Sequence, residues 1–246
     1  MPPVTKNIII INALIWLVEV ISPQFGANGI IRHLGLHYVG ASHFNPAQII
    51  TYMFVHDQHT FFHVFFNMLT LFFFGPMLER LWGGKRFLLF YMVCGVGAAL
   101  IQEGVWALTW MNEYIDFFSK ANHLTHAEAS ELVRQMAEAG RPDLVSALDA
   151  MKNSMVTVGA SGAIFGILLG FAFVFPNMPL YLFFIPVPIK AKYMVAGYAV
   201  IEFFFGVTGT MSTVAHFAHL GGMIFGLGLL LYWKHKGTLT GNRYQY

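Results

Sequence analysis

The segment NSMVTVGASGAIFGILLGFAFVF, residues 153–175, is the clearest sign of how this chain folds. It opens a run from 153 to 189 that contains no Asp, Glu, Lys or Arg, and a second such run covers 203–233. An ionised side chain at the centre of a bilayer costs about 2.5–3.5 kcal/mol on insertion scales, so runs of this length favour helices that span lipid. The sequence therefore predicts an all-α membrane protein.

The composition of the whole chain points the same way. Of 246 residues, 57% are hydrophobic and only 11% are charged, with 25 Phe and 13 Met, whereas soluble domains are about 25% charged. Each crossing takes roughly 20 apolar residues, so we expect residues 1–246 to form a single polytopic membrane domain. The net charge of +2 has no single basic patch behind it, which argues against a nucleic-acid partner.

Six transmembrane helices fit the charge-free segments and the positions of proline. They are expected at about 7–25, 52–76, 86–108, 155–175, 190–207 and 212–233. Nine of the fourteen Lys and Arg residues fall in short segments on the side of the N-terminus. The positive-inside rule therefore predicts that both termini are cytoplasmic.

The segment 109–153 between the third and fourth helices is expected to lie outside the membrane. Thr125 and Glu128 have the spacing of a capping box, Gly140 is suited to a helix end, and Pro142 is suited to a helix start. We interpret the segment as an extra helical hairpin. It is either a tolerated loop insertion or a platform for a substrate or partner.

Polar side chains occur in three of the expected helices, although lipid offers them no hydrogen-bonding partner. With both termini cytoplasmic, these three helices all enter the membrane from the outer face, so their polar side chains share one layer. The side chains are His56, His59, His63 and Asn67 in the second helix, Ser161 in the fourth, and His216 and His219 in the sixth.

Ser161 and His219 have the chemistry of a nucleophile and its base. Gly162, Gly166 and Gly170 form a stripe for close helix packing, and Ser161 points well away from the centre of that stripe. His219 shares a face with the glycines of its own helix. Without an adjacent carboxylate, its buried imidazole should favour the neutral form that a general base requires.

A serine nucleophile also needs donors for the oxyanion of its tetrahedral intermediate. Ser161 is expected in the first turns of its helix, where backbone N–H groups are unpaired. His63 and Asn67 are four residues apart and therefore present two side-chain donors from one helical face.

These residues resemble the rhomboid family of intramembrane serine proteases. The resemblance rests on Gly159-Ala-Ser-Gly162, on Ala218-His-Leu-Gly-Gly222 with Gly226, and on His63-Val-Phe-Phe-Asn67. The segment from Gly75 to Gly83 is also similar to the family. The ordered set spans roughly residues 45–233 and is much more specific than any one of its parts.

The resemblance implies a six-helix bundle in which Ser161 is the nucleophile and His219 the base, a dyad without a third acidic member and without a metal or cofactor. It assigns His63, Asn67 and the Ser161 N–H to the oxyanion site, and it places Phe165 against the catalytic imidazole. The implied substrates are single-pass transmembrane proteins, cleaved through an acyl-enzyme. The implied location is a bacterial inner membrane, with the active site opening to the outer face.

Two alternatives stay open. The histidines of the second and sixth helices, His56, His59, His63, His216 and His219, could bind zinc in a metal carrier, although no intramembrane carboxylate is expected beside them. A rhomboid-like protein could also bind transmembrane helices without cutting them. Glu19, Glu103 and Glu202 are interpreted as interhelical partners or interface residues without a catalytic role.

Overall fold

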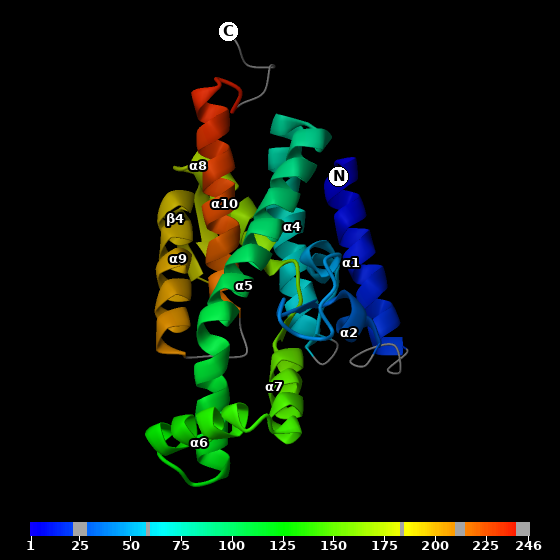
Figure 1. The fold of residues 1–246 in the computed structure, drawn as a ribbon. Helices are drawn as coiled ribbons and strands as arrows, with labels where there is room; N and C mark the ends of the chain where they lie inside the picture. Colours follow the sequence, from blue (N-terminus) through cyan, green and yellow to red (C-terminus); the bar gives the residue numbers. More distant parts are fainter. Residues whose placement is uncertain (22–28, 58–59, 183–184, 210–214, 240–246) are drawn as a thin grey trace.

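The computed structural model describes all residues except 22–28, 58–59, 183–184, 210–214 and 240–246. The described chain is mainly helical (Figure 1). The long helices are α1 (Pro3–Ile21), α4 (Phe61–Trp82), α5 (Gly84–Ala121), α6 (His126–Glu138), α7 (Pro142–Ser154), α8 (Ser161–Val174), α9 (Ala191–Thr208) and α10 (His216–His235). The short elements are α2 (Ile31–Leu34), β1 (Leu36–His37), α3 (Gln48–Thr51), the 3₁₀ helix η2 (Tyr52–Phe54), β2 (Val156–Thr157), β3 (Pro179–Leu182) and β4 (Ile185–Lys190).

Four helices in the described part of the chain are long and apolar enough to cross a membrane, namely α1, α4, α5 and α10. The helix α8 is apolar but has only 14 residues, about 21 Å at 1.5 Å per residue. It can be this short because nine of its residues are buried by other helices, so its ends meet protein groups rather than lipid. The count of six spans therefore stays a prediction.

Two expected helix starts are wrong. The helix expected at 52–76 begins at Phe61, because the chain before it forms α3 and η2. The helix expected at 155–175 begins at Ser161, because Val156 and Thr157 pair with β1 as a two-stranded antiparallel sheet. Both shifts bring polar residues to the first turns of their helices.

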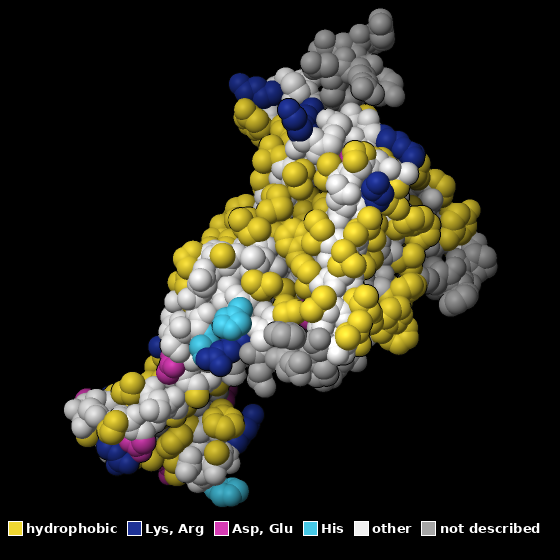
Figure 2. All heavy atoms as spheres, turned by 90° about the vertical axis from the view of Figure 1, so that its right-hand side faces the viewer, with side chains coloured by type: hydrophobic (Ala, Val, Ile, Leu, Met, Phe, Trp, Pro, Cys, Tyr) yellow, Lys and Arg dark blue, Asp and Glu magenta, His cyan; other side chains and the backbone are white. Residues whose placement is uncertain are grey.

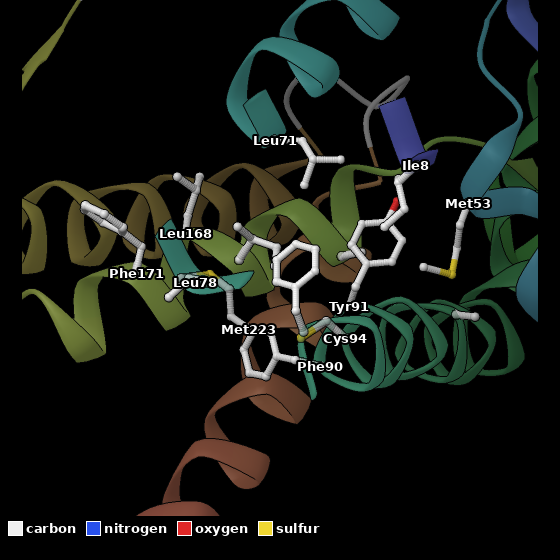
Figure 3. Close-up of a cluster of buried hydrophobic side chains, with 14 of the residues drawn as sticks. Ile8, Met53, Leu71, Leu78, Phe90, Tyr91, Cys94, Leu168, Phe171 and Met223 are labelled. Atoms are coloured by element: carbon white, nitrogen blue, oxygen red, sulfur yellow. The ribbon is translucent and has the colours of Figure 1, made fainter. Parts of the chain in front are cut away.

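The hydrophobic core lies where α8 is enclosed by α4, α5 and α10. Phe90, Tyr91 and Cys94 of α5 meet Phe171 of α8 and Met223 of α10 there, and the first four of these are almost completely buried (Figure 3). The glycine stripe of α8 faces α5 and α10, since a Cβ on Gly166 would meet Cys94. The stripe is thus a packing surface, as its small residues predict.

The surface is divided into an apolar middle and two charged ends. Hydrophobic side chains cover the middle of the face in Figure 2, while Lys and Arg gather at the upper end and charged groups of both signs on the lower lobe. The start of α1 and the end of α10 lie at the same end of the molecule, and α6 and α7 lie at the other (Figure 1). An apolar band between charged ends is the surface of an integral membrane protein.

The lower lobe has a small core of its own. The long helix α5 continues beyond the bundle, and its Tyr114 packs with Val133 of α6 and Leu144 of α7. At the start of α6, the Thr125 side chain accepts from the Glu128 N–H while the Glu128 carboxylate accepts from the Thr125 N–H at 2.8 Å. This capping box is the one that the sequence predicts.

Candidate active site

Ser161 stands at the first residue of α8 because the chain before it turns on a glycine. Gly159 has φ +121°, which side-chain-bearing residues rarely adopt, and its N–H donates to the Tyr52 carbonyl at 3.0 Å. The helical hydrogen bonds of α8 start with the Ile164 N–H, which donates to the Ala160 carbonyl at 3.0 Å. The Ser161 N–H is therefore one of the first N–H groups of the helix, which have no acceptor within the helix and lie at the positive end of its dipole.

His219 reaches Ser161 because α8 and α10 cross at two glycines. A Cβ on Gly222 would collide with the backbone of Gly162, so the absence of side chains is what lets the helices touch here. Ser161 directly precedes Gly162, and His219 lies one turn before Gly222. The His219 Nε2 atom is 2.8 Å from the Ser161 Oγ atom, a hydrogen-bonding distance.

The His219 ring is held in a buried position. Only 7% of the residue is exposed, and its ring stacks on that of Phe165, with the centroids 4.3 Å apart and the planes 5° from parallel. Phe165 lies one turn after Ser161 on α8. The same helix thus supplies both the hydroxyl and the surface that orients the imidazole.

His63 and Asn67 approach the same place from α4. Both line a cavity of about 650 Å³ together with Ser161, His219 and Phe165. A Cβ on Gly159 would lie 2.8 Å from the His63 Nε2 atom and 3.8 Å from the Asn67 Nδ2 atom, so both donors stand directly beside the turn that leads into Ser161. The cavity therefore contains a hydroxyl, an imidazole and side-chain donors around one space.

His56 contacts Asn67. The Asn67 Nδ2 group donates to the His56 Nε2 atom at 3.1 Å, and His56 is fully buried. His56 also contacts the edge of the His63 ring, with centroids 5.1 Å apart. His56 thus packs against His63 and Asn67 on the side away from the cavity, and these two residues line the cavity while His56 does not.

The sequence comparison identifies the fold that builds this cavity. A family model described as the Rhomboid domain matches residues 43–110 and 141–235, which together make up more than half of the chain. The chain belongs to the rhomboid family. This is a family of intramembrane serine proteases, and the match covers every residue that lines the cavity.

The rhomboid match omits residues 111–140, which contain the end of α5 and the whole of α6. This gap falls inside the segment 109–153 that the sequence marks as an insertion, while α7 lies within the matched part. No curated protein sequence matches the chain significantly.

One expectation about the rhomboid site is wrong. His219 does have an adjacent carboxylate, because the Glu202 Oε2 atom of α9 lies 2.9 Å from its Nδ1 atom. The same oxygen accepts from the His216 Nδ1 atom at 2.7 Å. The sequence signal was a single acid within the apolar helix α9, but nothing in the sequence says which way it faces.

The five-histidine zinc site is not formed by the described residues. His56 and His63 lie on the α4 side, His216 and His219 on the α9 side, and His59 lies outside the described residues. The group in the described chain that could hold a metal ion is instead Glu202, His216 and His219, whose ligand atoms all lie within 4.8 Å of one another.

Proposed function

We propose that this protein is an intramembrane serine endopeptidase that uses Ser161 as its nucleophile and His219 as its general base. The single observation that carries the proposal is the 2.8 Å approach of the His219 Nε2 atom to the Ser161 Oγ atom. A hydroxyl and a neutral imidazole at this distance can exchange the proton that activates the serine.

The reaction follows from the atoms around the cavity. The His219 Nε2 atom takes the Ser161 proton as the Oγ atom attacks a peptide carbonyl, and the imidazolium then gives that proton to the leaving amine. The acyl-enzyme that forms on Ser161 is hydrolysed by water, with His219 as base again. The Ser161 N–H, His63 and Asn67 are the donors that we assign to the oxyanion in both steps.

The substrates are transmembrane segments of other membrane proteins. A helical peptide bond has its carbonyl bonded within the helix, so the segment must unwind before it enters the cavity, and glycine or proline in the substrate lowers the cost. A second hollow of about 580 Å³ lies between α4 and α9, is lined mainly by Phe, Leu and Met side chains, and shares Phe66 with the catalytic cavity. Its apolar lining suits the part of the substrate that stays helical.

We assign the protein to a bacterial inner membrane, with both termini in the cytoplasm. Lys and Arg are in excess at the end of the molecule that contains the start of α1 and the end of α10, which supports this orientation. The starts of α4, α8 and α10, where the catalytic cavity lies, then face the outer side, where water reaches the serine.

A serine-directed fluorophosphonate tests the proposal directly. The purified protein in detergent should be labelled at Ser161, and labelling should disappear in Ser161→Ala and fall sharply in His219→Ala. Chelator treatment should leave labelling and cleavage unchanged, because no metal takes part in the reaction.

Cleavage that persists in Ser161→Ala refutes the proposal. A well-folded wild-type protein that captures transmembrane peptides but resists the fluorophosphonate would instead be a rhomboid-like binding protein. Activity that chelation abolishes and zinc restores would indicate the metal alternative.

A further inference from the structure

Four polar groups from three helices form one continuous chain at the catalytic cavity. The Ser161 Oγ atom is 2.8 Å from the His219 Nε2 atom, and the His219 Nδ1 atom is 2.9 Å from the Glu202 Oε2 atom. The same Glu202 oxygen is 2.7 Å from the His216 Nδ1 atom. Glu202 therefore stands on the side of the imidazole that faces away from the serine.

The tautomer of His219 explains what a carboxylate does at this position. To accept the serine proton, the Nε2 atom must be unprotonated, so the neutral ring carries its hydrogen on Nδ1. The side chain is only 9% exposed, and a buried N–H without an acceptor is costly. Glu202 is the acceptor within reach among the described residues.

The contact gains strength during the reaction. At rest the Nδ1 atom is close to the carboxylate, but its N–H is not aligned for a regular hydrogen bond. When His219 takes the proton from Ser161 it becomes a cation 2.9 Å from an anion in a site that excludes most water. Attraction that appears only as charge develops favours the transition state over the resting state.

His216 explains how Glu202 is held. The Glu202 side chain is 13% exposed and that of His216 is 6% exposed, so the carboxylate is largely removed from solvent. Donation from the His216 Nδ1 atom satisfies the oxygen and fixes its position. His216 and His219 are three residues apart and lie on one face of α10, which lets one carboxylate of α9 contact both.

We propose that Glu202 is a positioning residue that sets the tautomer and orientation of His219, and that His216 anchors Glu202. The proposal rests on the serine protease function proposed above. In this proposal the expected dyad of Ser161 and His219 has a third, acidic member, Glu202 of α9.

The same three side chains are also a candidate metal site, but two of the distances between their ligand atoms are too short for one zinc ion. Two ligand atoms on a tetrahedral zinc ion are roughly 3.3 Å apart, given Zn–N and Zn–O bonds of about 2.0–2.1 Å. The observed separations are shorter, 2.7 Å for the His216–Glu202 hydrogen bond and 2.9 Å between the His219 Nδ1 and Glu202 Oε2 atoms.

The test compares Glu202→Gln, which keeps the shape and removes the charge, with Glu202→Asp, which keeps the charge. Glu103→Gln is the matched control, because Glu103 is also a glutamate of a long apolar helix, and its carboxylate accepts from the Val39 N–H at 2.8 Å. For each variant, the rate of fluorophosphonate labelling and the kcat and KM for a transmembrane substrate are measured from pH 5 to pH 9, together with the thermal unfolding midpoint.

In Glu202→Gln we expect kcat and the labelling rate to fall between about 10-fold and 10⁴-fold, the upper bound being the loss when the triad aspartate of a serine protease is replaced by asparagine. KM and the unfolding midpoint should change little, and Glu202→Asp should recover part of the loss. Glu103→Gln should behave as wild type.

The pH profile separates positioning from a structural role. The titratable groups that face His219 are Glu202 of α9, His216 of its own helix, and His63 and Asp57 from the α4 side. Removing the Glu202 charge makes the imidazole harder to protonate, so the acidic limb of the labelling profile should move to lower pH. A defect in packing alone would lower the rate without moving this limb.

Wild-type rates with an unmoved acidic limb in Glu202→Gln would overturn the inference while leaving the protease proposal intact, since wild type would still be labelled at Ser161. Stoichiometric zinc bound by the wild type and lost in Glu202→Gln would also overturn it, in favour of a metal site. Absence of Ser161 labelling in the wild type would defeat the protease proposal itself.

Discussion

At the scale of single residues, the proposed catalytic cavity depends on side chains that hold other side chains in place. Phe165 stacks on His219, His56 accepts from Asn67, and His216 donates to Glu202. Each of these supporting groups is largely or partly buried, so its orientation is set by packing. The groups that we assign to the reaction are thereby preorganised before a substrate arrives.

The oxyanion assignment predicts a specific kinetic loss. Asn67→Ala should lower kcat by about 10²–10³-fold with little change in KM, because one donor to the developing charge is removed. His63→Ala should have an effect of the same kind. The measurement is steady-state cleavage of a transmembrane substrate in detergent.

His126→Ala is the control for these variants, because His126 is exposed in the lower lobe, away from the cavity, and contacts Asp116. The oxyanion assignment is wrong if Asn67→Ala and His63→Ala raise KM at unchanged kcat, since those side chains would then act in substrate binding alone.

At the scale of helices, the crossing of α8 and α10 brings the site together. Gly162 and Gly222 make the backbones touch, and Gly166 lets Cys94 of α5 fit against the same helix. The hydroxyl and the imidazole come from different helices, so their distance is set by this crossing. A change that separates the helices by a methyl group would also separate Ser161 from His219.

We therefore predict that Gly222→Ala destabilises the protein and impairs labelling at Ser161. Its new methyl group would collide with the Gly162 backbone, and overpacking of this kind costs about 1–3 kcal/mol. The unfolding midpoint in detergent and the fluorophosphonate labelling rate measure the two effects.

Gly228→Ala is the matched control on the same helix, because a Cβ there meets no atom within 4 Å. Alanine is a better helix former than glycine, so this variant should be as stable as wild type or more so. Equal unfolding midpoints and labelling rates in the two variants would show that the crossing of α8 and α10 can accommodate an added methyl group.

At the scale of the whole molecule, the apolar band separates two ends that are built from different elements of the chain. One end contains the start of α1, the end of α10 and the turn between α4 and α5. In the last turn of α4, the Glu79 carboxylate accepts from the Thr5 N–H of α1 at 2.7 Å. The other end contains the lobe of α6 and α7, and the proposed catalytic cavity is lined by residues at the starts of α4, α8 and α10. The proposed orientation puts the first end in the cytoplasm.

Cysteine accessibility tests this orientation. The wild-type chain has a single cysteine, Cys94, which is fully buried and should not react. A maleimide that cannot cross membranes should label Asn122→Cys in intact cells with a permeable outer membrane, and Lys236→Cys only after the inner membrane is opened. Both native side chains are exposed. Asn122 directly follows α5 and Lys236 directly follows α10, and these two helices end at opposite ends of the molecule (Figure 1). Labelling in the reverse order would invert the proposed topology.

The amino-acid sequence was enough to predict an all-α membrane protein of the rhomboid family. It also singled out Ser161, His219, His63, Asn67 and Phe165 as candidate site residues. It could do so because the cost of charge in lipid and the spacing of small residues are local properties of the chain. The capping box at Thr125 was equally local, since both of its partners lie within one helical turn.

The starts of α4 and α8 and the partners of the buried polar groups became visible in the folded chain alone. The start of α8 depends on the pairing of β2 with β1, more than 100 residues earlier in the chain. The sequence did not distinguish Glu202 from an acid at a helix interface. The packing of α9 against α10 brings its carboxylate into contact with His216 and His219. Such contacts depend on how helices cross and rotate against one another, and that geometry is set by packing across the bundle, which no single stretch of sequence contains.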